Sequence, residues 1–280
     1  MKLVPMIDLI KDAQNKLQGV AAINVSNLET IKSVLEASCM VGYPVILQVA
    51  PIQLKLENIS YYEIVEIAKI LGEKYDIETS VHLDHAETVQ QCFEAIDCGF
   101  TSVMYDGSSK PFEVNIRNTK KVVEYAREKN VTVEGELGRV GGAEASTEDI
   151  EALMTNPDEA EYYVKSTGVD CLAVSIGNAH GEYKLEPKLN FQLLENIYKK
   201  VNIPLVLHGG TGIPDDHIKK AITLGIGKVN FFTEIDREFV KGFINAYEKD
   251  HNSYMMACAN EASKKMIKKA LDKINLCKVN

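Results

Sequence analysis

Residues 79–107 read TSVHLDHAETVQQCFEAIDCGFTSVMYDG. Two short runs rich in β-branched residues, 79–86 and 100–107, enclose a stretch of helical period at 88–98. Runs that are apolar nearly throughout are typical of strands in a parallel sheet, because helices cover both faces of such a sheet. The stretch therefore predicts one strand–helix–strand unit.

The same unit recurs along the whole chain. Strand candidates lie at 19–26, 43–50, 79–86, 100–107, 131–138, 170–177, 203–210 and 227–234. Helix candidates lie at 28–41, 60–75, 88–98, 112–129, 157–167, 190–200 and 214–224. A helical tail follows from about residue 235 to about residue 275.

Eight such repeats in 280 residues favour an α/β fold of the (β/α)₈ TIM-barrel type with a C-terminal helical extension. With no linker or low-complexity tract, we expect one domain over residues 1–280. A doubly wound open sheet is the alternative. It is disfavoured because INVSNL (23–28) stands where a G-x-G-x-x-G would follow the first strand.

Composition narrows the class of protein. The net charge of −9 argues against a general binder of nucleic acid or anionic membranes, although local basic spots could hold a small phosphate. Six scattered cysteines without a C-x-x-C pair indicate reduced thiols in a cytoplasmic protein. The N-terminal residues 1–16 carry charges every few positions, so we expect neither a signal peptide nor a membrane span.

Polar residues gather where the predicted strands end, and in a barrel those ends form the rim that carries reactive groups. Three of the six histidines, His85, His180 and His208, fall at the ends of three separate strands. Neutral imidazoles with open coordination positions are a known catalytic zinc arrangement, although a single histidine is more often a scaffold residue. We interpret His82 as structural, and His217 and His251 as surface residues.

A phosphate site is indicated by HGGTGIPDD (208–216). Its glycines allow a tight turn with exposed backbone N–H groups, and Pro214 suits the first turn of a following helix. A plain strand-to-helix turn is the alternative. Asn230 and Thr233 on the next strand and Lys184 on the preceding loop would complete a polar cup.

Two carboxylates are candidates for proton transfer. Asp84 directly precedes a candidate metal ligand, whereas Glu144 lies in the glycine-bearing, acidic segment 139–156 that interrupts the repeat. Long loops in compact domains are often functional. Two independently placed carboxylates can serve two distinct proton transfers, and the alternative for Glu144 is a solvated surface acid.

Together these motifs resemble the class II, metal-dependent ketose-bisphosphate aldolases, and in particular the fructose-/tagatose-bisphosphate aldolase branch. The resemblance covers essentially the whole chain. It rests on AAINVSNLET (21–30), HLDHAET (82–88), SVMYDGS (102–108), VEGELGRVGGAE (133–144), GNAHGEYK (177–184), LHGGTGIP (207–214) and KVNFFTE (228–234).

The resemblance implies reversible cleavage of fructose or tagatose 1,6-bisphosphate to dihydroxyacetone phosphate and glyceraldehyde 3-phosphate through a zinc-stabilised enediolate. It implies His85, His180 and His208 as Zn²⁺ ligands, with Asp106 and Glu136 at a second or displaced metal position. Asp84 matches the acid/base at the carbon–carbon bond, and Glu144 matches the loop carboxylate that protonates the carbon next to the ketone. The implied substrate and phosphate pocket comprises Asn24, Gly181, Lys184, Gly209, Gly210, Thr211, Asn230 and Thr233.

The resemblance also implies a glycolytic setting, a homodimer or homotetramer, and allows a monovalent cation at the site. Phe232 departs from the acidic residue common in fructose-type members, and Asp236 stands where an arginine for the far phosphate is common, with Arg237 adjacent. An aldolase for another phosphorylated ketose is therefore one alternative. A zinc hydrolase and a non-catalytic sugar-phosphate-binding barrel are the others.

Overall fold

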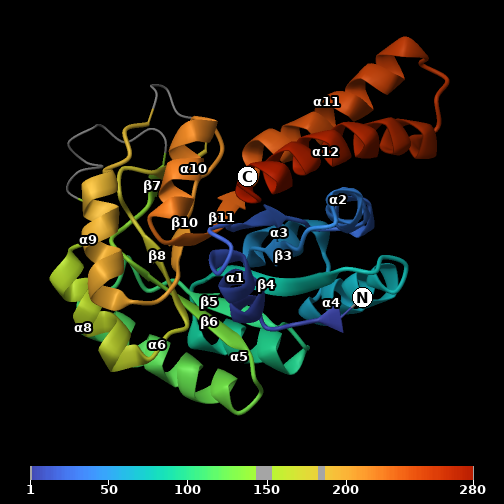
Figure 1. Ribbon diagram of the computed structural model, residues 1–280. Coiled ribbons are helices and arrows are strands. Elements are labelled where there is room, and N and C mark those ends of the chain that lie inside the picture. The colour runs from blue at the N-terminus through green and yellow to red at the C-terminus, as the bar shows by residue number, and fades with distance from the viewer. Residues whose placement is uncertain (1, 143–152, 182–186, 280) are drawn as a thin grey trace.

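Eight parallel strands close into a barrel in the computed structural model, which describes residues 2–142, 153–181 and 187–279 (Figure 1). Around the barrel the order is β4-β3-β2-β11-β10-β8-β6-β5, and β5 pairs with β4 to close it. The predicted TIM barrel is confirmed. The strands are β2 (Val20–Asn24), β3 (Val45–Val49), β4 (Glu78–Ala86), β5 (Ser102–Tyr105), β6 (Thr132–Leu137), β8 (Cys171–Val174), β10 (Leu205–Leu207) and β11 (Ile226–Phe231).

Seven helices around the barrel match the predicted ones, with bounds that differ by at most three residues. Their starts are encoded locally, since Asn27, Ser60 and Thr88 each accept a hydrogen bond from the backbone of the first helical turn. These helices are α2 (Leu28–Val41), α4 (Tyr61–Gly72), α5 (Val89–Asp97), α6 (Phe112–Arg127), α8 (Pro157–Thr167), α9 (Phe191–Val201) and α10 (Asp215–Thr223).

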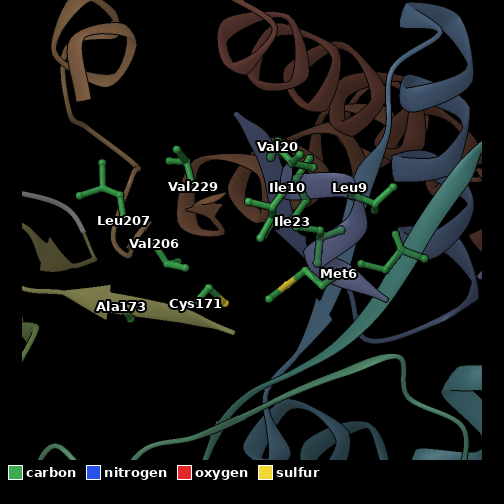
Figure 2. Packing of buried hydrophobic residues seen from close by; sticks show 14 of the residues in the cluster. Met6, Leu9, Ile10, Val20, Ile23, Cys171, Ala173, Val206, Leu207 and Val229 are labelled. Carbon is green, nitrogen blue, oxygen red and sulfur yellow. The ribbon is translucent and has the colours of Figure 1, made fainter. Parts of the chain in front are cut away.

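One helix that the repeat pattern did not predict, α1 (Met6–Gln14), lies across the amino ends of the strands. The Ile7 N–H donates to Thr132 Oγ1 at the start of β6, and the Gln14 amide donates to the carbonyl of Gly225 beside β11. Its apolar face, which includes Met6 and Ile10, packs against the strand side chains in Figure 2. Two further short elements, β1 (Lys2–Leu3) and α3 (Pro51–Glu57), were also not predicted.

The C-terminal helical tail is two helices, α11 (Thr233–Lys249) and α12 (Met255–Cys277), which fold back on each other and extend beyond the barrel (Figure 1). The break comes at Asp250, whose extended backbone ends α11. The last turns of α12, with Ala270, Ile274 and Cys277 buried, join the core. No helix of the described ranges combines the length and apolar character needed to cross a membrane.

Two short strands tie together the loops at the carboxyl rim. β7 (Gly141–Gly142) lies in the segment after β6, and β9 (Ala179–His180) lies in the segment after β8. They pair in parallel, with Gly142 opposite His180. The segments that follow β6 and β8 therefore meet beside one of the candidate metal ligands.

Candidate metal centre and active site

The three histidines converge on one side of the barrel mouth. His85 comes from the end of β4, His180 from β9 and His208 from the residue after β10. One ring nitrogen from each lies within 4.8 Å of one from each of the others. The ring centroids of His85 and His208 are 4.8 Å apart. The arrangement could hold one metal ion.

His85 reaches this position through an irregular backbone. In a regular strand Asp84 and His85 would point to opposite faces of the sheet. His85 has a φ of 51°, and the pairing of β4 with β5 shifts register between Leu83 and Ala86. A left-handed conformation costs about 1–3 kcal/mol in a non-glycine residue. This local strain allows Asp84 and His85, neighbours in sequence, to face the same site. Asp84 Oδ1 and His85 Nε2 are 4.0 Å apart.

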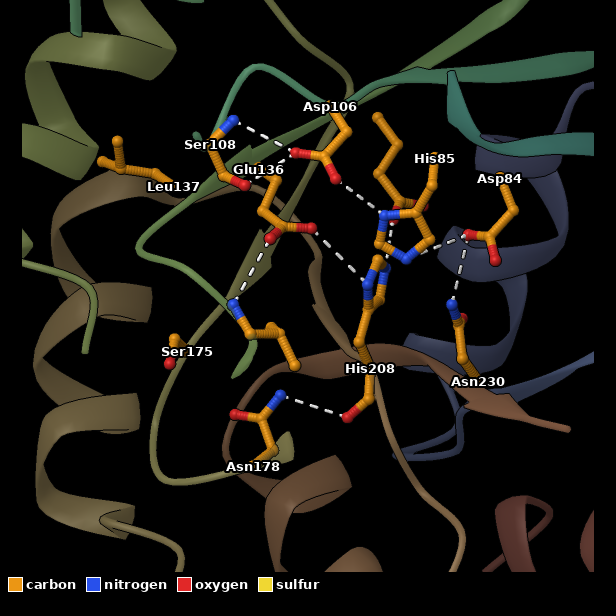
Figure 3. A network of polar contacts seen from close by, with 12 residues as sticks. Asp84, His85, Asp106, Ser108, Glu136, Leu137, Ser175, Asn178, His208 and Asn230 are labelled. Atoms are coloured by element: carbon orange, nitrogen blue, oxygen red, sulfur yellow. Dashed lines mark hydrogen bonds and ion pairs between the residues drawn. The ribbon is translucent and has the colours of Figure 1, made fainter. Parts of the chain in front are cut away.

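His208, whose ring is buried, is held through both its ring and its backbone. Its Nε2 lies 2.9 Å from Glu134 Oε1, and its backbone carbonyl accepts a hydrogen bond from the Asn178 side chain. Its Nδ1 lies 3.6 Å from Glu136 Oε2, and neither atom has a hydrogen-bond partner within the described part of the chain (Figure 3). A buried nitrogen and a buried carboxylate oxygen without partners fit a divalent cation that accepts both kinds of ligand.

A second group of potential ligands overlaps the first. His85, Asp106 and Glu136 also bring one ligand atom each to within 4.8 Å of the others. His85 Nδ1 lies 2.9 Å from Asp106 Oδ2, while Ser108 donates to the other oxygen of Asp106 (Figure 3). The residues expected at a second or displaced metal position therefore lie beside the three-histidine group.

The charges of the site shift its titrating groups in different directions. Burial opposes a charged His85, but Asp84 and the hydrogen bond to Asp106 raise the pKa of His85 to about 10. Burial and the nearby charge of His85 lower the pKa of His180 to about 4 and that of His208 well below its usual value. Burial, together with Asp106, raises the pKa of Glu136 to about 8. Two of the three imidazoles are thus neutral at pH 7, as a metal ligand must be.

Asp84 is held by two side-chain amides, one from the neighbouring strand β3 and one from β11. Gln48 Nε2 donates to one carboxylate oxygen at 3.3 Å. Asn230 Nδ2 donates to the other at 3.4 Å (Figure 3). Gln48 also donates to Asn24 Oδ1 at 2.7 Å. Gln48 was not predicted from the sequence as a residue of the site. Its signal was a buried polar residue inside the otherwise apolar run VILQV (45–49).

A cavity of about 220 Å³ opens beside Asp84 and the histidines. Six of the eight residues expected in the substrate and phosphate pocket line it: Asn24, Gly181, Gly209, Thr211, Asn230 and Thr233. Within the described residues, the Thr211 hydroxyl and the side-chain amide oxygen (Oδ1) of Asn230 are buried without hydrogen-bond partners. Both are positioned to bind a polar ligand.

Gly209 and Gly210 play different parts in this wall. Gly209 has a φ of +66°, and a Cβ there would lie 1.9 Å from the Ala179 carbonyl oxygen, so the turn requires glycine. Gly210 does not line the cavity, and its N–H donates to the Asn230 carbonyl at 2.9 Å. The expectation that Gly210 offers an exposed N–H is therefore wrong. That N–H instead joins the turn to β11.

A larger cavity, of about 490 Å³, lies on the other side of the histidines. It shares His85 and His180 with the smaller one, and Lys110 and Arg139 add positive charge to its wall. The candidate metal centre therefore lies between the two cavities. Glu144 and Lys184 lie outside the described residues.

Four further residues that the sequence singled out lie at or beyond the edge of the site. Phe232 precedes α11, is 42% exposed and lines the smaller cavity, while Asp236 lies in the first turn of α11. His251 is exposed, and His217 is partly exposed, with its ring edge against Phe191. His217 lies on α10, and the ring of Phe191 at the start of α9 packs against it.

Comparison with known proteins gives one consistent result. The family model described as "Fructose-bisphosphate aldolase class-II" matches residues 4–278. A fructose-bisphosphate aldolase of Staphylococcus aureus is 42% identical over 274 residues, which is 96% of each chain. One from Geobacillus stearothermophilus is 43% identical over 256 residues, covering 91% of this chain and 89% of that one.

Among solved structures, the YdjI aldolase from Escherichia coli K12 superimposes with a TM-score of 0.86 at 33% identity. The match covers 99% of this chain and 97% of that chain. The likeness thus extends over the barrel and the C-terminal helices alike.

Proposed function

The chain belongs to the class II fructose-bisphosphate aldolases, and from this premise we propose how its residues divide the reaction among them. It is a carbon–carbon lyase that splits fructose 1,6-bisphosphate into dihydroxyacetone phosphate and glyceraldehyde 3-phosphate. The observation that carries the assignment of roles is the pair of buried, unpartnered atoms at His208 Nδ1 and Glu136 Oε2.

We propose that His85, His180 and His208 hold one catalytic Zn²⁺, with Asp106 and Glu136 offering a second or displaced position for it. The convergence of the three rings supports the first set, and the short distance between His85 and Asp106 supports the overlap of the two. When bound, Zn²⁺ supplies a Lewis acid for the ketone of the substrate. The site also allows a monovalent cation.

Asp84 is the acid/base at the carbon–carbon bond. In cleavage it removes the proton of the C4 hydroxyl while the C3–C4 bond breaks, and in synthesis it returns that proton. Its support is the pair of amide donors, Gln48 and Asn230, which fix both carboxylate oxygens at the edge of the smaller cavity.

Glu144 is the second proton carrier, which protonates the carbon next to the ketone and so completes dihydroxyacetone phosphate. It follows β7 by two positions in the sequence, and β7 pairs with β9, which carries His180. This proximity along the chain supports its role. In this proposal, Glu144 acts in the later protonation step and Asp84 acts in the bond cleavage.

The triose ketone and its phosphate occupy the smaller cavity. Gly181, Lys184, Gly209, Thr211, Asn230 and Thr233 form this pocket in the proposal, and Gly210 supports its turn. The unpartnered Thr211 hydroxyl and the unpartnered side-chain oxygen Oδ1 of Asn230 support a polar ligand here. We further propose that residues 1–280 act as one domain, in a cytoplasmic homodimer or homotetramer.

The test is incubation of the purified protein with fructose and tagatose 1,6-bisphosphate, with and without a chelator, while triose phosphate is measured. We expect cleavage of the fructose sugar that stops with chelator and returns with Zn²⁺. Cleavage that resists full removal of metal would exclude the zinc mechanism. Failure of the metal-loaded protein to cleave either sugar would leave another phosphorylated ketose, a hydrolase or a non-catalytic barrel, and would overturn the proposal.

A further inference from the structure

Directly beneath the histidines, the barrel contains charged and polar side chains that the proposed reaction does not use. Lys228 from β11, Glu134 from β6 and His82 from β4 are all fully buried. Removing an ion pair from water costs several kcal/mol per ion unless hydrogen bonds compensate for it. The burial of these charged side chains in the middle of the barrel is therefore expected to serve a function.

The hydrogen bonds around Lys228 can be assigned in only one direction. Its Nζ lies 2.8 Å from Glu134 Oε2 and 3.2 Å from His82 Nε2. An ammonium group only donates, so His82 Nε2 accepts and the ring proton is on Nδ1. That Nδ1 lies 2.8 Å from Ser102 Oγ, whose hydroxyl donates onward to the sulfur of Met6.

The other end of the chain reaches the candidate metal ligand. Glu134 Oε1 lies 2.9 Å from His208 Nε2, and a carboxylate oxygen only accepts. The proton of His208 is therefore on Nε2, and the lone pair is on Nδ1. Nδ1 is the atom that faces Glu136 without a hydrogen-bond partner among the described residues.

We propose that the Lys228–Glu134 pair is a positioning device that fixes His208 as an Nδ1 metal ligand. The inference rests on the proposed function, because it assumes that His208 binds the metal. Lys228 neutralises Glu134 and occupies its second oxygen, which leaves the first oxygen to receive only the His208 proton. Without Lys228 the carboxylate would be an uncompensated buried charge, and His82 would lose its donor.

A metal-binding histidine usually donates its other ring N–H to an oriented acceptor, and loss of such an acceptor typically costs 10–100-fold in metal affinity. Here the acceptor is itself held by a cation from a strand across the barrel. Each member is completely buried, so water cannot replace a lost partner. The pair acts through His208 and touches no substrate.

The test uses the full-length protein with Co²⁺ as the probe metal, in four forms: unchanged, Lys228→Met, Glu134→Gln and the double variant. We expect each single variant to lower Co²⁺ affinity about 10–100-fold in competition with a chelator and to alter the visible Co²⁺ spectrum. In Glu134→Gln alone, the Lys228 ammonium competes for the single amide oxygen, and the amide NH₂ would then face the His208 N–H. In the double variant no cation competes, so the amide oxygen can accept the His208 proton and much of the affinity should return. Recovery in the double variant is a result that simple damage to packing would not give.

A second readout is the tautomer of His208 in the metal-free protein, measured by ¹H–¹⁵N correlation across two bonds of the ring. The proton should be on Nε2 in the unchanged protein and should redistribute in Lys228→Met. Cys171→Ser is the matched control, since Cys171 Sγ donates only at 4.0 Å to Glu134 Oε2 and serine keeps a hydrogen-bond donor at that position. This control should keep Co²⁺ affinity within about threefold.

The outcomes separate the two proposals. If His85→Ala, His180→Ala and His208→Ala each bind Co²⁺ as tightly as the unchanged protein does, the proposed metal centre is wrong. If that binding is as expected but Lys228→Met keeps both the affinity and the His208 tautomer, the positioning role is wrong. Should Lys228→Met fail to fold, Glu134→Gln, which conserves volume, decides the same question by the same two readouts.

Discussion

The Nδ1 atom of His208 lies 3.6 Å from the Oε2 atom of Glu136, and both atoms are buried without a hydrogen-bond partner in the described part of the chain. Buried polar atoms are almost always paired, and leaving one unpaired costs about 1–3 kcal/mol. Two such atoms facing each other at the barrel mouth are explained together by a cation between or beside them.

Replacing His208 by alanine should remove the bound metal. The substitution takes away one of three nitrogen ligands, so we expect residual zinc below about a tenth of the normal content after dialysis, measured by atomic emission. His251→Ala, which changes an exposed histidine, is the control and should keep full metal content. Normal metal content in folded His208→Ala, with folding checked by circular dichroism, would contradict the ligand assignment.

Asp84→Asn should keep the metal but lose activity. The amide has the shape of the carboxylate but cannot take up the C4 hydroxyl proton, so kcat should fall by about 10²–10⁴-fold. Triose phosphate release and zinc content are measured on the same sample. Asp97→Asn, at an exposed carboxylate paired with Lys129, should leave both values unchanged. Loss of metal together with activity would mean that Asp84 serves the metal site instead.

Glu144→Gln should slow hydrogen exchange at the carbon next to the ketone of dihydroxyacetone phosphate, while zinc content stays normal. We expect a decrease of about 10²-fold or more, because the amide cannot carry the proton. Exchange is followed by loss of the proton signal in deuterated water. Glu148→Gln, four residues further along the same segment, is the control. An unchanged exchange rate in Glu144→Gln would rule out this role.

Metal affinity should rise with pH. In the metal-free protein, Asp84 and Asp106 outweigh the effect of burial and raise the pKa of His85 to about 10, so at pH 7 the ring holds a proton that the metal must displace. Affinity should therefore increase up to about tenfold per pH unit between pH 6 and 9, with about one proton released. Glu136, with a pKa raised to about 8, would add a second proton below that pH if it also binds. Calorimetry in buffers of different ionisation enthalpy counts the protons, and no buffer dependence would refute this prediction.

Gly209→Ala and Gly42→Ala form a matched pair. Both glycines have left-handed backbones, with φ of +66° and +62°, so alanine at either position costs about 1–2 kcal/mol. Only at Gly209 would the new Cβ collide with backbone, 1.9 Å from the Ala179 carbonyl oxygen. Gly209→Ala should lower the free energy of unfolding by about 1–3 kcal/mol more than Gly42→Ala, measured by urea denaturation. Equal losses would mean that the turn can relax away from β9.

Local sequence determined the barrel and most of the rim. Strand and helix periods repeat within a dozen residues, and caps such as Asn27 and Thr88 fix helix starts through contacts three residues away. Because the carboxyl ends of parallel strands share one edge, residues at those ends could be expected to meet even though they are far apart in the chain. The positions of His85, His180 and His208 at strand ends therefore predict their convergence, which the structure shows.

Tertiary structure alone decided how these side chains are held. The left-handed backbone of His85 and the pairing of β7 with β9 depend on neighbours that no local pattern encodes. Glu134 meets His208 across 74 positions of the chain and Lys228 across 94. The strands predict only that such residues face the barrel interior. Which nitrogen of His208 is left for a metal depends on hydrogen bonds that form once the barrel has closed, because each donor finds its acceptor on a different strand.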